Sequence, residues 1–152
     1  FLLTFDDGRR DSFEGADPVL EALGYKAIMF MPAAETVPDP KWLSSYYLTI
    51  KDVKQMIRSG RWEIGSHAVQ KNGGYVPIGG SEQGNFLSNR SWLADQGRFE
   101  SEQEHYERVA YELTESKKGL ENEYHVDIES FAYPFGDYGQ QTINHPGAAA
   151  VI

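Results

Sequence analysis

The sequence contains no cysteine, and its 152 residues include only 14 lysines and arginines against 23 aspartates and glutamates. Without cysteine the chain forms neither a disulfide framework nor a thiolate metal site. The net charge of −9 argues against nucleic acid and anionic membrane surfaces as partners. No apolar run approaches the roughly 18 residues that cross a bilayer, so we expect no membrane insertion within this chain. Neutral and cationic polymers remain compatible with the charge.

The composition that remains is ordinary for a globular protein, with 40% hydrophobic and 24% charged residues. A chain of this length folds as one domain with a proper core. It opens inside one strand-like segment and closes on another, residues 148–152. We therefore expect residues 1–152 to form one domain, and a partial one.

The most informative segment is the first, where an apolar run from Phe1 delivers two adjacent acids, Asp6 and Asp7, into Gly8. Desolvating one carboxylate is costly, and a second one beside it adds like-charge repulsion. A metal ion on one acid resolves the conflict and leaves the other free to move protons. The pattern predicts metal-assisted hydrolysis, although the two acids could also merely cap the following turn.

Four segments have the apolar character of buried strands, and three of them end in unusual residues. These strands are expected at residues 1–5, 26–31, 61–66 and 130–133. The first delivers Asp6 and Asp7, the third delivers His67, and the last ends in Tyr133-Pro134-Phe135-Gly136. Chemistry in parallel α/β folds collects at the carboxyl ends of strands, so we expect these residues to form one site.

Helices are expected between the strands. One covers residues 11–23, with its regular part starting at Pro18 because proline disrupts a helix interior. A second starts at a Thr49–Asp52 capping box, and a third starts at Ser101 with an apolar stripe from Tyr106 to Leu120. Residues 68–98 are rich in Gly, Asn and Ser and are expected to form one long loop. The alternation of strands and helices indicates an α/β fold with parallel strands.

At this point three motifs resemble a known family. Residues 4–8 (Thr-Phe-Asp-Asp-Gly), His67 at a strand end and residues 131–136 (Phe-Ala-Tyr-Pro-Phe-Gly) resemble, in order, the first three motifs of NodB-like polysaccharide deacetylases, carbohydrate esterase family 4. The resemblance implies a distorted (β/α) barrel of the polysaccharide deacetylase type, truncated at its C-terminal end.

An insertion before the third helix points to a subgroup. Residues 89–93 (Asn-Arg-Ser-Trp-Leu), 98–101 and 104–108 look like a segment of poly-β-1,6-N-acetylglucosamine deacetylases. Ala132 stands where many other relatives carry an arginine, which also favours this subgroup. The implied activity is removal of N-acetyl groups from a β-linked N-acetylglucosamine polysaccharide, with release of acetate, and the substrate class implies an extracytoplasmic location.

The resemblance implies roles for the motif residues. Asp7 and His67 would bind a divalent metal ion, with Zn, Co or Ni expected from the imidazole ligand. Asp6 would be the catalytic base, and the backbone N–H of Phe135 would stabilise the tetrahedral oxyanion. Tyr133, Pro134 and Trp92 would contact the polysaccharide.

The third metal ligand departs from the family pattern, which has a second histidine where this chain has Lys71 and Asn72. A protonated lysine does not bind metal, whereas the Asn72 carbonyl is a weaker donor suited to harder cations. We therefore expect an Asp7-His67-Asn72 site; the alternatives are a two-ligand site completed by water, or no metal.

Other features leave choices open. His105, His125 and His145 fall outside the motifs, and the first two are expected on the surface. Arg9 and Arg10 could orient substrate or pair with a neighbouring acid. Two other functions share the motifs: an O-acetyl esterase acting on another glycan, and a degenerate, metal-free glycan-binding domain.

Overall fold

A three-stranded parallel sheet organises the protein, in the order β1 (Thr4–Phe5), β2 (Ala27–Met31), β3 (Trp62–Ser66). The computed structural model describes residues 1–33, 46–69 and 74–139. The predicted strand over 130–133 is reduced to one parallel bridge between Phe131 and Ser66 at the free edge of β3. The α/β class is confirmed. Closure into a barrel stays a prediction, because the described residues form an open sheet.

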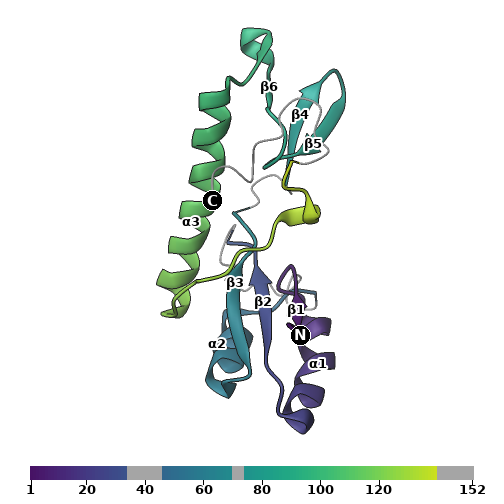
Figure 1. Cartoon of the computed structure of the whole chain (residues 1–152), viewed down its shortest axis with the longest axis vertical. Coiled ribbons are helices and arrows are strands. Elements are labelled where there is room, and N and C mark those ends of the chain that lie inside the picture. Colours follow the sequence, from purple (N-terminus) through teal and green to yellow (C-terminus); the bar gives the residue numbers. More distant parts are fainter. Residues whose placement is uncertain (34–45, 70–73, 140–152) are drawn as a thin grey trace.

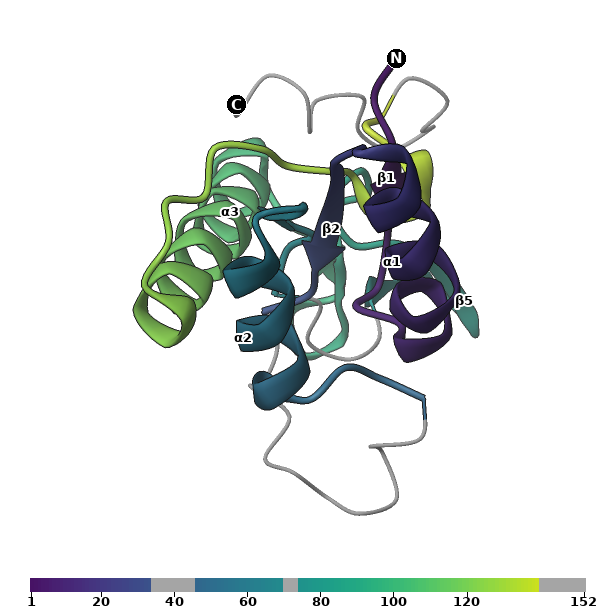
Figure 2. The ribbon, with the colours of Figure 1, turned by 90° about the horizontal axis from the view of Figure 1, so that it is seen from below.

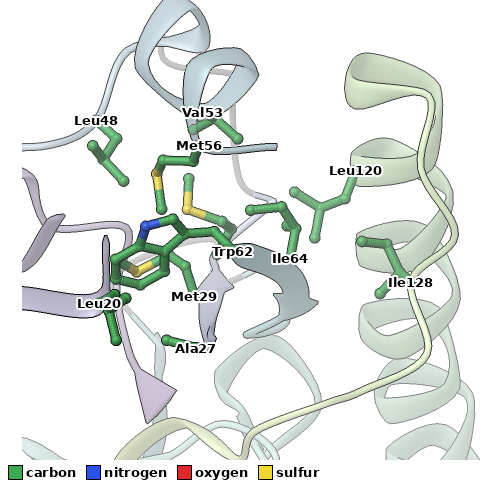
Figure 3. Close-up of a cluster of buried hydrophobic side chains, with 11 residues drawn as sticks. Leu20, Ala27, Met29, Leu48, Val53, Met56, Trp62, Ile64, Leu120 and Ile128 are labelled. Atoms are coloured by element: carbon green, nitrogen blue, oxygen red, sulfur yellow. The ribbon is translucent and has the colours of Figure 1, made fainter. Parts of the chain in front are cut away.

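The core lies where helices cover this sheet. All five residues of β2 are buried, which explains its uninterrupted apolar sequence. In Figure 3 the Trp62 indole lies among Leu20, Met29 and Met56. The buried cluster consists of Leu20, Ala27, Met29, Met31, Leu48, Val53, Met56, Trp62, Ile64, Leu120 and Ile128.

Helices α1 (Arg10–Leu23) and α2 (Ile50–Ser59) follow the first two strands and lie to either side of β2 (Figure 2). The capping box predicted at Thr49 and Asp52 is confirmed. The expectation that regular helix begins only at Pro18 is wrong, because α1 starts eight residues earlier, at Arg10. Pro18 removes one hydrogen bond, to the Glu14 carbonyl, and both residues are exposed, so water can replace that bond.

Helix α3 (Glu102–Tyr124) runs alongside the sheet and reaches the β6 end of the molecule (Figure 1). Its predicted start is confirmed by a capping box between Ser101 and Glu104. The predicted apolar stripe is only partly correct, since Val109 and Leu120 are buried but Tyr106 is half exposed. His105 is buried and contacts the Leu87 carbonyl, so its predicted surface position is wrong. His125 is exposed, as predicted, and caps α3.

The segment predicted as one long loop contains two antiparallel hairpins in its described part. The first pairs β4 (Tyr75–Gly79) with β5 (Glu82–Asn85), and the second pairs β6 (Trp92–Leu93) with β7 (Arg98–Phe99) around a 3₁₀ turn, η2 (Ala94–Gln96). Gly79 and Gly80 both have positive φ and make the first turn, so the glycines taken as loop signals in fact connect strands. No helix in the described part of the chain combines the length and apolarity needed to span a membrane.

Candidate active site

The ends of β1, β3 and the Phe131 bridge meet at one edge of the sheet. Asp6 and Asp7 follow β1, His67 follows β3, and the turn η3 (Pro134–Gly136) follows the bridge. Because the strands are parallel, their carboxyl ends share this edge, as the sequence predicted. The three motifs therefore lie at one place in the fold.

Asp7 and His67, from the first and second motifs, are in direct contact. Oδ1 of Asp7 lies 3.5 Å from Nε2 of His67, and Nδ1 of His67 lies 2.9 Å from the Ala132 carbonyl oxygen. Since a carbonyl only accepts hydrogen bonds, Nδ1 carries a proton. In the neutral ring, Nε2 then presents a lone pair to a carboxylate oxygen, so two acceptors face each other. Such a pair is stable only with a cation or a proton between them.

The backbone around His67 is firmly held. Its N–H donates to the Met31 carbonyl at the end of β2, and the Ala68 carbonyl accepts from the Ala33 N–H at 2.8 Å. The imidazole is buried, whereas the Asp7 side chain is 54% exposed. The pair therefore combines one fixed, buried side chain with one that is open to solvent.

Gly8 is required by the path of the chain after the acids. Asp7 and Gly8 both have left-handed φ, +65° and +62°. A Cβ at Gly8 would lie 2.7 Å from the Met31 sulfur, so no other residue fits without moving that side chain.

Asp6 is exposed and has no hydrogen bond or ion pair within the described residues. Its carboxylate is thus available for proton transfer. The two arginines after the acids are engaged elsewhere: Arg9 binds Asp11 and Tyr46, and Arg10 binds Asp52 at 2.8 Å. Neither pairs with Asp6.

The η3 turn presents Phe135 with φ +62° and a 53% exposed side chain over a buried Pro134. We find no hydrogen bond to the Phe135 N–H among the described residues. Asp137, next to the turn, accepts hydrogen bonds from Asn85 at the end of β5 and from Ser88 beyond it. Burial raises the pKa of Asp137, but these hydrogen bonds outweigh it and keep the pKa below its usual range.

The rings of Tyr75 and Phe135 pack against each other at this turn. Tyr75 of β4 packs on Phe135 with ring centroids 4.9 Å apart, and Tyr75 is 43% exposed. Tyr133 packs on Phe131, and burial raises the pKa of the Tyr133 hydroxyl. The predicted wall of Tyr133, Pro134 and Phe135 thus lies at the strand edge, with Tyr75 added to it.

Of the remaining predicted site residues, Trp92 lies within the described part of the chain, in the second hairpin. Trp92 packs on Phe99 in the β6–β7 hairpin, and within the described residues it has no ring contact or hydrogen bond with Asp7 or His67. Lys71, Asn72 and His145 lie outside the described residues. In the described ranges no cluster of three or more histidine and acidic residues suited to a metal occurs.

Sequence reasoning missed two contributors to the site. The Ala132 carbonyl that selects the His67 tautomer is a backbone group and leaves no trace in the sequence. Glu112 of α3 accepts from the Val69 N–H at 3.0 Å, next to the His67 turn. Its signal was available, because Glu112 follows the buried Val109 by three residues on the same helix face.

Comparison with known proteins agrees with the three motifs. The family model for polysaccharide deacetylase matches residues 1–149. The chain belongs to the polysaccharide deacetylase family. It is 26% identical over 149 residues to the poly-beta-1,6-N-acetyl-D-glucosamine N-deacetylase of Escherichia coli K12, a match that covers 90% of this chain and 22% of that protein.

Solved deacetylase structures share the fold of this family member. The BpsB deacetylase domain of Bordetella bronchiseptica superimposes with a TM-score of 0.78 at 25% identity, covering 98% of this chain and 59% of that one. A de-N-acetylase from Aggregatibacter actinomycetemcomitans gives the same TM-score at 21% identity, covering 99% and 58%. The predicted family and fold type are confirmed, and the chain spans about a fifth of the curated relative's length.

Proposed function

We propose that the chain is a metal-dependent hydrolase that removes N-acetyl groups from a β-linked N-acetylglucosamine polysaccharide and releases acetate. The observation that carries the proposal is the pair of facing acceptors, Asp7 Oδ1 and His67 Nε2, 3.5 Å apart. Family membership supports the reaction class, and the name of the E. coli relative supports the amide substrate. The substrate class supports a location outside the cytoplasm.

The donor set fits a divalent cation such as Zn, Co or Ni. A histidine whose other nitrogen donates to a carbonyl is the usual arrangement of a metal-binding imidazole, because that bond fixes the tautomer. Asp7, His67 and the amide of Asn72 would hold the ion. When bound, a divalent metal polarises the amide carbonyl and makes water more acidic.

The chain's own groups handle the proton and the developing charge. Asp6, unpaired in the described structure, takes a proton from the water whose oxygen attacks the acetyl carbon. The Phe135 N–H donates to the carbonyl oxygen as it becomes negative. The C–N bond then breaks as the sugar nitrogen gains the proton that water lost. The acetic acid formed gives its remaining proton to the new amine, so the products are acetate and a protonated amine.

Aromatic surfaces account for recognition of the polymer. The exposed faces of Tyr75 and Phe135 form a platform on which a sugar ring can stack, with Tyr133 and Pro134 behind it. Trp92 would meet a more distant sugar unit. Deacetylation produces amines, and the net charge of −9 attracts the resulting cationic polymer.

The test combines metal content with acetate release from β-1,6-linked N-acetylglucosamine oligomers. We expect Asp7→Ala to lose the metal, and Asp6→Asn to retain it while turnover falls by about 10²-fold or more. Asp95→Ala, at an exposed aspartate in the second hairpin, is the matched control and keeps both.

Two outcomes would favour the competing functions. Faster acetate release from O-acetylated xylan oligomers than from the amide substrate would make the chain an esterase. A protein that binds the oligomers but takes up no Zn, Co or Ni, and releases no acetate, would be a metal-free glycan-binding domain.

A further inference from the structure

Helix α3 buries two polar side chains against the turn that carries His67. Glu112 is 6% exposed and Ser116 is fully buried, although the same helix face packs Val109 and Leu120 into the core. Burying a carboxylate is unfavourable unless it is hydrogen-bonded, and an apolar residue would pack here at lower cost. These residues therefore need an explanation beyond packing.

Glu112 bonds the backbone of this turn directly, whereas Ser116 reaches it through the Ser66 hydroxyl. Glu112 Oε2 accepts from the Val69 N–H at 3.0 Å. Ser66 Oγ accepts from the Ala68 N–H at 3.3 Å and donates to Ser116 Oγ at 2.7 Å.

Ser116 completes this chain of hydrogen bonds, since its Oγ donates in turn to the Leu113 carbonyl at 3.0 Å. The hydroxyls of Ser66 and Ser116 each accept one hydrogen bond and donate another. The consistent direction from the turn into α3 makes the helix a fixed support for the backbone that follows β3.

The turn needs such support because Ala68 has φ +63°, a conformation that side-chain-bearing residues rarely adopt. Strained backbone persists only where its surroundings over-determine it. A relaxed turn would move the neighbouring His67 ring away from Asp7 and from the Ala132 carbonyl.

We propose that Glu112 is a positioning residue that, with Ser116, holds the strained turn after β3 and so aims the His67 imidazole at Asp7. The part of this inference that concerns metal affinity rests on the proposed function; the part that concerns the ring does not. Glu112 acts through its hydrogen bond with the Val69 amide, and no role on the reacting atoms is assigned to it.

The experiment compares three variants of the full chain. Glu112→Leu removes the acceptor at similar volume, and Glu112→Gln retains an acceptor oxygen. His105→Leu is the matched control, because His105 is also buried on the same face of α3, two turns away, and contacts the Leu87 carbonyl instead of the turn.

Two readouts need no metal: the amide exchange rate of Val69, and the ¹⁵N spectrum of the His67 ring, which reports its tautomer. We expect Glu112→Leu to speed exchange at Val69 by about tenfold or more and to release the fixed tautomer. Glu112→Gln retains the slow exchange at Val69 and the fixed His67 tautomer of the parent, and His105→Leu changes neither property. With Zn added, Glu112→Leu should bind about 10- to 100-fold more weakly.

The two proposals fail separately. A parent protein that takes up no metal, while Glu112→Leu frees the His67 ring, would refute the proposed function and leave the positioning role standing. An unchanged His67 spectrum in folded Glu112→Leu would overturn the positioning role. If Glu112→Leu does not fold, Ser116→Ala decides: unchanged exchange at Ala68 and an unchanged His67 spectrum would equally overturn it.

Discussion

The Asp7–His67 contact is either a pair of facing hydrogen-bond acceptors or an imidazolium–carboxylate ion pair. Replacing Asp7 with asparagine distinguishes the two. In the parent, Oδ1 of Asp7 and the lone pair of His67 Nε2 face each other across 3.5 Å. Asparagine has the same shape but places an N–H where the carboxylate has an oxygen, so it can donate to Nε2. We therefore expect Asp7→Asn to stabilise the metal-free protein while it abolishes metal binding.

The expected gain follows from the exposure of the site. A neutral hydrogen bond contributes about 0.5–1.5 kcal/mol net, and the 54% exposure of Asp7 places this one in the lower half of that range. Asparagine tolerates φ +65° at least as well as aspartate, so the backbone adds no penalty. A gain of about 0.5–1 kcal/mol corresponds to a Tm about 1–4 °C higher for a domain of this size.

The assay is urea and thermal unfolding at pH 8, first with a chelator and then with excess zinc. Free zinc at about 100 times its Kd should stabilise the parent by about 2.7 kcal/mol and leave Asp7→Asn unchanged. Asp6→Asn is the control, because it removes one charge from the same pair but lies away from His67. A lower stability of Asp7→Asn in chelator would show an imidazolium–carboxylate ion pair and refute the reasoning, as would equal stabilisation of both proteins by zinc.

Three further substitutions test other parts of the structure. Gly65→Ala places a Cβ 2.4 Å from the Phe30 ring, so urea unfolding should show a loss of about 1–3 kcal/mol that Phe30→Leu partly reverses; strict additivity would contradict the clash. Asp17→Ala breaks the ion pair with Arg61 and should cost about 1–3 kcal/mol at pH 7. Hydrogen bonding from Arg61 holds the pKa of Asp17 below its usual range, so this contribution is complete above about pH 4 and disappears as the pH falls through the lowered value. A difference between the proteins that stays constant down to pH 2 would contradict that assignment. Tyr75→Ala should raise KM for oligomer deacetylation with kcat little changed, and an unchanged KM would exclude Tyr75 from the platform.

Features set by local chemistry could be predicted from the sequence. The capping boxes at Thr49 and Ser101 each satisfy two backbone groups with side chains three residues apart, and both helices start there. The strand that precedes His67, β3, was predicted because a short apolar segment has few structural alternatives to a buried strand. Placing Asp7 and His67 together required only that β1 and β3 run parallel.

Features set by distant partners could not be predicted. His105 is buried because the Leu87 carbonyl, in another segment, accepts a hydrogen bond from its ring. The β4–β5 hairpin has Pro77 and Gly84 within its strands, which removes the apolar alternation that marks a strand. Pro18 lies inside α1 because the helix packs Leu20 into the core, and that burial outweighs one lost hydrogen bond.

The distribution of backbone strain adds an argument that sequence patterns do not contain. Among the described residues, four non-glycine positions have positive φ: Asp7, Ala68, His125 and Phe135. His125 ends α3, where this conformation is common. The other three each follow one of the strand ends that form the candidate site. Glycine would adopt these conformations without the cost of about 1–2 kcal/mol per residue, but it would remove the carboxylate at position 7 and the aromatic ring at position 135. Strain retained at all three strand ends, where glycine would relieve it, favours a site held for chemistry over three unrelated turns.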